Sequence, residues 1–406
     1  MRDGLAQAWL VAVVVLVCGC SEDGPVEGEN GARCDPPHRL IATGQCVPSG
    51  VGDDGCPAGT LAQGEACVPA GVPPQRCAEG FVPEEDGCAP LLPAEPCGPG
   101  FMAVPGDTRC RAVADCASGT WGDIVVDAST QYVDASFSGA TSDGSATQPW
   151  KTIGEAVSAS SSGAVVAIAA GVYAEDILLS GKPVRLWGVC PALVELRGSG
   201  SAIAALDIRA GATSSEVHGI AITSGHYGIG VSGAEDVVVE RVWIHDTDAR
   251  GIDVEDTLGP ASANIVGSLV ETAVEVGVFM AGAPVTMDSS VVRGTLPLSD
   301  MTLGRGLGVQ LGLTGSSAKV TLARSVIESN HELGMFCGSS ELTLEGTVVR
   351  LTSPQASDDE LGAAIGTAAT LENARPKLTV RGSWLAENHG SAIIIEDSDV
   401  DVDDSV

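Results

Sequence analysis

The chain has 406 residues and a formal net charge of −32, from 53 acidic and 21 basic residues. Such a surface repels nucleic acid and anionic lipid headgroups, which argues against a nucleic-acid-binding protein. Hydrophobic residues make up 44% of the chain but aromatic residues only 3%, so a core must be built from Val, Ile, Leu and Ala.

Residues 1–19 are expected to be an export signal. Their apolar run, Ala8 to Val17, is too short for a bilayer span of roughly 20 residues. The run leads into Gly19-Cys20, which resembles a bacterial lipobox, in which a small residue precedes the cysteine that is lipidated. The resemblance implies an exported protein anchored to the membrane through Cys20, and the residue after it favours the outer membrane. An ordinary secretory signal cut nearby is the alternative.

Residues 20–33 are acidic and Gly-rich, which predicts a flexible tether, and residues 34–116 hold nine of the 13 cysteines. Each repeat in this region contains a Cys, a Gly- or Pro-containing turn, a short run and a second Cys. In an exported chain this favours disulfides over zinc, which would need closer cysteines or clustered His. The bridges would staple a stalk of small units. The simplest pairing is Cys34–Cys46, Cys56–Cys67, Cys77–Cys88 and Cys97–Cys110, with Cys116 left for Cys190 or Cys337.

From residue 117 onward the composition is typical of short strands. An amphipathic helix is predicted over 151–160, and Val/Ile/Leu runs broken by Gly and Pro follow it. The stretches WKTIGEAV and VVAIAAGVYAEDILLSGKPVRLWG resemble the opening coils of pectinesterases and of related bacterial surface proteins. These belong to the pectate-lyase-like superfamily. The resemblance implies an all-β, right-handed parallel β-helix over 117–406, with the helix as its N-terminal cap.

Internal repeats predict the same solenoid. Four segments share an apolar-x-apolar pattern that ends in a polar turn, and a Gly with a short strand follows each of them. They are VVVERVWIHDT (237–247), VTLARSVIESN (320–330), LTLEGTVVRLT (342–352) and LTVRGSWLAEN (378–388). The final VDVDDSV begins a further coil in the same frame. We therefore expect either a chain truncated at its C-terminus or a partner that covers this end.

The stretch richest in ionisable side chains is IHDTDARGIDVED, residues 244–256. A polysaccharide lyase of this superfamily would need carboxylates that hold Ca²⁺ and a base that removes the proton α to a uronate carboxylate. The candidates are Asp246, Asp248 and Asp253 as ligands and Arg250 as the base. From the neighbouring turns only Glu271 and Glu275 could join them, so the carboxylate cluster is incomplete. A solvated turn is the preferred interpretation, with no metal and no assigned catalytic residue.

The pectinesterase resemblance does not extend to the catalytic motifs. The family's Asp-Phe-Ile-Phe-Gly stretch has no counterpart, and its Leu-Gly-Arg-Pro-Trp stretch is matched only by Leu303, Gly304 and Arg305, in an expected insertion. No catalytic role is carried over.

Outward-facing strand positions indicate a binding surface. One expected outward column is apolar, and Phe279 and Phe336 occupy another. The apolar column comprises Ala221, Trp243, Leu269, Val291, Val326, Val348 and Trp384. An exposed apolar stripe with aromatic residues is typical of a surface that binds sugar rings or a protein. In the alternative, the insertions or the Cys-rich stalk fold over it.

These patterns predict a surface-exposed lipoprotein whose β-helix is not an enzyme. It would be structural or adhesive, and would bind an extracellular polysaccharide or a partner protein through Trp243, Trp384, Phe279 and Phe336. The alternative is a polysaccharide-active enzyme, a lyase, epimerase or hydrolase, that uses the four candidate residues. No cofactor is predicted unless the carboxylates hold Ca²⁺. The fold does not decide between the two, because one scaffold supports many functions.

Overall fold

A computed structural model describes residues 71–84, 87–371 and 374–406, and the backbone of strands between residues 26 and 69. The chain divides into two compact units, Met1–Ala70 and Gly71–Val406. The predicted signal, Cys20 and the side chains of the four cysteines expected to pair before residue 70 lie outside the described residues. No helix of the described part is long and apolar enough to cross a membrane.

The described residues of the first unit form three antiparallel strand pairs. These are β1 (Val26–Glu27) with β2 (Arg33–Cys34), β3 (His38–Leu40) with β4 (Cys46–Pro48), and β5 (Thr60–Gln63) with β6 (Ala66–Pro69).

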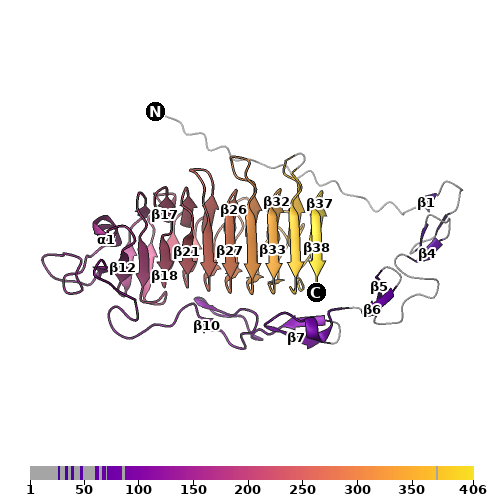
Figure 1. The fold of residues 1–406 in the computed structure, drawn as a ribbon, viewed down its shortest axis with the longest axis horizontal. Helices are drawn as coiled ribbons and strands as arrows, with labels where there is room; N and C mark the ends of the chain where they lie inside the picture. Colours follow the sequence, from indigo (N-terminus) through magenta and orange to yellow (C-terminus); the bar gives the residue numbers. More distant parts are fainter. Residues whose placement is uncertain are drawn as a thin grey trace. The chain divides into compact units, whose positions relative to one another are not determined.

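The second unit is an all-β parallel β-helix, which confirms the predicted fold class (Figure 1). Three parallel sheets run along it. Sheet 1 comprises β11 (Gln131–Val133), β12 (Val165–Ile168), β15 (Arg185–Gly188), β18 (Glu216–His218), β21 (Val237–Glu240), β24 (Ala263–Val266), β27 (Pro284–Asp288), β30 (Lys319–Ala323), β33 (Glu341–Glu345), β36 (Lys377–Arg381) and β38 (Asp399–Asp403).

Sheets 2 and 3 complete each coil. Sheet 2 comprises β13 (Gly171–Ala174), β16 (Val194–Arg197), β19 (Ala221–Ser224), β22 (Trp243–Thr247), β25 (Leu269–Glu271), β28 (Val291–Arg293), β31 (Val326–Glu328) and β34 (Val348–Arg350). Sheet 3 comprises β14 (Ile177–Leu179), β17 (Ala204–Arg209), β20 (Tyr227–Ser232), β23 (Ile252–Glu255), β26 (Val276–Ala281), β29 (Arg305–Gln310), β32 (Leu333–Gly338), β35 (Ala363–Ala368) and β37 (Ile393–Glu396).

The core follows from the alternation of apolar residues along each strand. Side chains alternate between the two faces of a strand. Because successive coils keep the same register, each inward-facing apolar side chain stacks on the equivalent side chain of the next coil. In sheet 1, Ile265 pairs with Met287 and Met287 with Leu322, and all three are buried in one continuous cluster. This stack removes the aliphatic side chains from water, which is the main stabilising contribution to a solenoid core.

The predicted helix is α1 (Ile153–Ala159), and it is the one α-helix of the described residues. A capping box fixes its start, since the Thr152 side chain accepts from the Glu155 N–H and the Glu155 carboxylate accepts from the Thr152 N–H. Its buried residues are Ile153, Ala156 and Val157, the face that the sequence predicted. The helix contacts β11, β12 and β14, at the first coil.

Long and short coils alternate in the C-terminal half of the solenoid. The connections from sheet 3 to sheet 1 are long at 256–262, 311–318 and 369–376, and short at 282–283, 339–340 and 397–398. On the other edge of sheet 3, long connections precede β29 (294–304) and β35 (351–362). The structural repeat is therefore a pair of coils, and sheet 3 has insertions along both of its edges.

Residues 71–84 and 87–116 form a strap that runs beside the solenoid (Figure 1), and its apolar side chains pack on the outer face of sheet 2. The strap contains the 3-10 helix η1 (Pro74–Arg76), the hairpin β7 (Phe81–Glu84) with β8 (Gly87–Pro90), and β9 (Phe101–Met102) paired with β10 (Arg111–Ala112). Disulfides join Cys77 to Cys88 and Cys97 to Cys110 within it. Cys116 is bonded to Cys190 of the solenoid, and Cys337 is free and buried.

The strap corrects the expectation of an exposed apolar column. Leu269, Val291, Val326 and Val348 do face outward on sheet 2, but they are buried in a cluster with strap residues that include Phe81 and Met102. Trp243 and Trp384 pack against the same cluster and are only partly exposed. The described part of the Cys-rich region is thus no free stalk, and Trp243 and Trp384 are not an open binding surface.

Polar contacts fix the register of the strap. The Glu271 carboxylate accepts from the Gly100 N–H at 2.9 Å and from Trp243 Nε1 at 2.8 Å. Arg293 pairs with Glu271 at 2.6 Å and donates to the carbonyls of Gly98 and Phe101. Gly100 has a φ of +72°, and a Cβ there would lie 3.3 Å from the Trp243 ring. Both the backbone conformation and the close contact with the ring favour glycine at this position.

Candidate functional site

The structure separates the four candidate residues into two groups. Asp246 lies near the end of β22 on sheet 2 and Asp248 in the connection that follows it, and both are exposed. A hydrogen bond from His245 at 2.8 Å lowers the pKa of Asp246, so its carboxylate is already engaged. Asp253 lies instead on the outer face of sheet 3, in β23, and Arg250 lies in the connection that leads into β23, with its guanidinium over the same face. Among the described residues, no group of three His, Cys, Asp or Glu side chains is arranged to hold a metal ion.

Arg250 is held between two carboxylates and two aromatic rings. Its Nη1 donates to Asp253 Oδ2 at 2.7 Å, and its Nε and Nη2 donate to Glu275 Oε1 at 3.1 and 2.9 Å. The guanidinium lies 3.8 Å from the centroid of the Phe279 ring and 5.5 Å from that of Tyr227. Glu275 and Phe279 belong to the next coil and Tyr227 to the preceding one, so the stack links three coils.

The electrostatics of this cluster do not suit Arg250 as a base. Burial acts to lower the pKa of Arg250, but the Asp253 and Glu275 carboxylates outweigh burial and raise it above its already high usual value. A guanidinium that is paired twice and held protonated has no lone pair to accept a proton. Arg250 is therefore suited to binding and positioning.

Asp253 has the more unusual environment. Its side chain is only 5% exposed, and its Oδ1 has no hydrogen-bond partner. Burial raises the pKa of Asp253 to about 7, although the Arg250 guanidinium favours the ionised form. A buried carboxyl that can carry a proton near neutral pH is a candidate proton donor, while ion-pair networks without a catalytic function also perturb pKa values.

A second cluster repeats this arrangement two coils further on. Arg305 pairs with Glu332 at 2.5 Å, and its guanidinium lies 4.6 Å from the centroid of the Phe336 ring. Arg305 is the first residue of β29, not part of an insertion as the sequence suggested. The repeat shows which residues the stack itself needs, namely Arg, Glu and Phe. Asp253 is the exception, because Gly308 occupies the equivalent position in the second cluster.

Phe279 and Phe336 remain partly exposed on sheet 3, in the same outward column as Asp253 and Gly308. Gly308 makes room for the first ring, since a Cβ there would lie 3.0 Å from Phe279 Cδ2. The sequence identified both rings, but it missed Tyr227 and Glu332. The available signal was the dipeptide Arg-Gly, at 250–251 before β23 and at 305–306 at the start of β29, with a Phe one coil later in each case.

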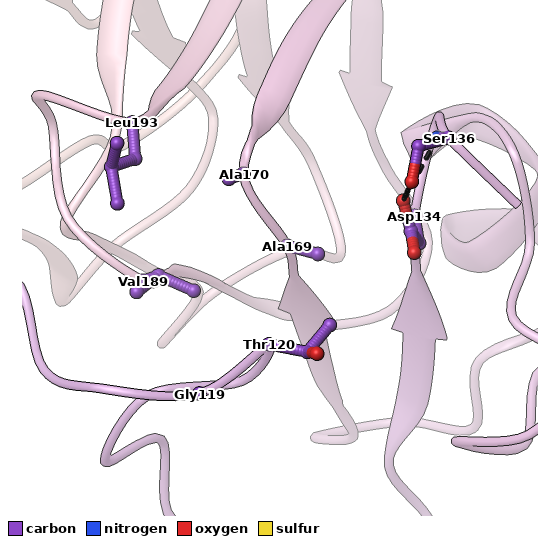
Figure 2. A pocket seen from close by; sticks show the side chains of 8 residues that line it. All are labelled: Gly119, Thr120, Asp134, Ser136, Ala169, Ala170, Val189 and Leu193. Carbon is purple, nitrogen blue, oxygen red and sulfur yellow. Dashed lines mark hydrogen bonds between the residues drawn. The ribbon is translucent and has the colours of Figure 1, made fainter.

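Two cavities of the described part lie away from these clusters. One, of about 240 Å³, is at the N-terminal coils and is lined by Gly119, Thr120, Asp134, Ser136, Ala169, Ala170, Val189 and Leu193 (Figure 2). Its one carboxylate, Asp134, accepts from the backbone N–H and the hydroxyl of Ser136. The other, of about 460 Å³, lies over sheet 1. Neither contains a residue that the sequence had singled out.

No family model and no curated protein matches the sequence. Several solved structures are similar. The pectate lyase Pel9A is 14% identical over 71% of this chain and 71% of that chain, with a TM-score of 0.45. A pectin methylesterase from Aspergillus niger is 12% identical over 70% and 86% of the two chains, with a TM-score of 0.40. An alginate lyase from a Paenibacillus species is 11% identical over 61% and 96%, with a TM-score of 0.43. All three are named for activity on a polysaccharide, and at these identities the similarity concerns the fold alone.

Proposed function

We propose that the chain is a surface lipoprotein, anchored through Cys20, whose sheet 3 binds an extracellular polysaccharide along its outer face. The observation that carries the proposal is the pair of Arg–Phe stacks on a face that the strap leaves uncovered. Sugar-binding surfaces combine planar groups that pack on the C–H faces of the rings with polar groups that hydrogen-bond the hydroxyls. Tyr227, Phe279 and Phe336 supply the first kind, and the guanidinium–carboxylate pairs supply the second.

The double-coil repeat supports a polymer rather than a single sugar. The two stacks lie two coils apart, which is roughly 10 Å at the spacing of adjacent strands. This is the length scale of a disaccharide unit in an extended chain. Two equivalent contacts at that spacing would bind a linear polymer better than either would alone, because the second contact forms within the same complex.

A second candidate function is cleavage of the bound polymer. It is favoured by one observation, the buried Asp253 carboxyl with its unpartnered oxygen and raised pKa. In that case Asp253 would donate a proton to the bridging oxygen as the glycosidic C–O bond breaks, a water molecule would supply a hydroxyl to the anomeric carbon and return its proton to Asp253, and Arg250 would position the substrate.

Replacing Phe336 with alanine should weaken polysaccharide binding about tenfold, equivalent to about 1.4 kcal/mol, because one stacked ring is lost. Phe336 is chosen because it lies outside the cluster of Arg250 and Asp253, so its loss leaves that cluster unchanged. Trp187→Ala is the matched control, since Trp187 is a partly exposed aromatic residue on sheet 1. The measurement is retention by a panel of immobilised polysaccharides, with the chain length of the soluble polymers followed in parallel.

Equal losses in the Phe336 and Trp187 variants would contradict the assignment of the binding face to sheet 3. Shortened polymer chains that disappear in Asp253→Asn would establish the second candidate function. Retention without shortening would establish a binding module.

A further inference from the structure

We infer that the polysaccharide bound by sheet 3 carries no carboxylate or sulfate groups, and is neutral or bears amines. This rests on the proposed function and names the class of ligand that the face selects.

Among the described residues, each arginine on the outer face of sheet 3 is already paired with a carboxylate of this chain. Arg209 pairs with Asp207 at 2.5 Å. Arg250 is paired twice and Arg305 once, as described above. The exposed parts of Arg250 and Arg305, 18% and 13% of each side chain, can meet a sugar hydroxyl but offer no unpaired charge to an anionic sugar. A ligand carboxylate would have to displace a carboxylate that is already desolvated and in place.

Four of the five insertions that border sheet 3 have acidic residues or no charged residue, and none of these four has a basic residue. The segments 256–262, 294–304, 311–318 and 351–362 contain no Lys, Arg or His. They contain five acidic residues, Asp256, Asp300, Asp358, Asp359 and Glu360. The one cation of 369–376, Arg375, pairs with Asp397 at 2.9 Å and with Asp399 at 3.1 Å.

The electrostatic potential over the outer face of sheet 3 is therefore negative and repels acidic polymers. Carboxylates without partner cations raise the local negative potential, and the net charge of −32 adds to it. A bound cation could reverse the sign, but no such cluster of ligands exists in the described part of the chain. Like charges brought together at a binding surface lower affinity and act against wrong partners.

The connections along both edges of sheet 3 expose apolar side chains, which suit an uncharged sugar ring. Leu258, Leu313 and Leu371 are 54%, 77% and 55% exposed. Each lies in one of the long connections from sheet 3 to sheet 1, which occur in every second coil. Leu296, Met301, Leu351 and Leu361 are exposed in the connections along the opposite edge. Apolar side chains on both edges would pack against the C–H faces of sugars, and they offer nothing to an acidic group.

The experiment measures the affinity of the protein for three probes at low salt: a soluble neutral β-glucan, chitosan oligosaccharides and polygalacturonate. We expect the glucan or the chitosan to bind at least tenfold more tightly than polygalacturonate. The double variant Asp300→Lys with Asp358→Lys should strengthen polygalacturonate binding at least tenfold. Both positions are exposed, so the fold should tolerate the change.

Glu345→Lys with Asp401→Lys is the matched control, because it makes the same change in net charge at exposed positions on sheet 1. An equal gain in polygalacturonate binding there would overturn the inference, since repulsion would then arise from the whole chain. Tight binding of polygalacturonate by the unmodified protein would also overturn it, and would leave the proposed function standing. Binding of none of the three probes would overturn the proposed function itself, and the inference with it.

Discussion

Replacing Leu269 with alanine should lower the free energy of unfolding by about 3 kcal/mol, within the range of about 2–5 kcal/mol for buried leucines. Leu269 begins β25 and faces outward, yet its side chain is 0% exposed because the strap covers it. It packs in one cluster with Met102 and Val104 of the strap. The truncation removes buried methyl groups and leaves a cavity between two parts of the chain that are far apart in sequence.

The control is Leu313→Ala, the same chemical change at a position that is 77% exposed. It should change the free energy of unfolding by less than about 0.5 kcal/mol. Chemical denaturation gives both values, and limited proteolysis reports whether the strap alone becomes cleavable in the Leu269 variant. Equal stability of the two variants would show that the strap does not pack on sheet 2 in solution.

The packing of the strap on sheet 2 is a part of the fold that the sequence did not predict. Alternation along a strand tells which side chains share a face, but it does not tell what that face meets. The outward column of Leu269, Val291, Val326 and Val348 was therefore equally compatible with an open surface and with a covered one. The buried partners Phe81 and Met102 lie in short Cys-rich repeats with no long apolar period, so no pattern predicted where they pack.

The coils themselves were predictable because each inward position repeats. A Val, Ile or Leu in the same place of every coil has one stable arrangement, in which it stacks on its equivalents. The helix α1 was predictable for a similar reason, since its apolar face and its capping residues are local in sequence. The alternation of long and short coils was not recognised, because the insertions differ in sequence and only their positions repeat.

The candidate site was predictable in part. Arg250 and Asp253 are three residues apart, so a local cluster of charges identified both. Glu275 and Phe279 reach Arg250 only through the register of the next coil, and Tyr227 through that of the previous one. The raised pKa of Asp253 depends on burial, which cannot be read from a sequence that places this residue on an outward face.

The contribution of Asp253 to the stability of the protein should fall as the pH rises from about 4 to about 7. Its pKa in the folded state is about 7, whereas an unfolded chain gives an aspartate a pKa near 3.9. Between these values the folded state keeps a proton that the unfolded state has lost. The stabilisation is therefore complete below about pH 4 and is lost as the pH rises to about 7. The shift corresponds to a free energy on the order of 4 kcal/mol.

The variant Asp253→Asn isolates this effect, since an amide does not titrate. The difference in unfolding free energy between the unmodified protein and the variant should favour the unmodified protein progressively more as the pH falls from 7.5 to 4. Asp401→Asn, at an exposed position of β38, is the control, and its profile should run parallel to that of the unmodified protein. Parallel profiles for Asp253→Asn as well would mean that Asp253 is ionised throughout, held by Arg250.

The outcome also bears on the choice between binding and cleavage. If Asp253 is protonated for part of the time at neutral pH, the charge of Arg250 is balanced chiefly by Glu275, and Asp253 has a proton to donate to a sugar oxygen. If Asp253 is always ionised, the cluster is a closed ion pair, and its contribution is to hold the Tyr227–Arg250–Phe279 stack in place. The second cluster lacks this carboxyl and holds its arginine with Glu332 alone. The stack therefore does not require Asp253, and an Asp253 that titrates near neutral pH points to a function other than stability.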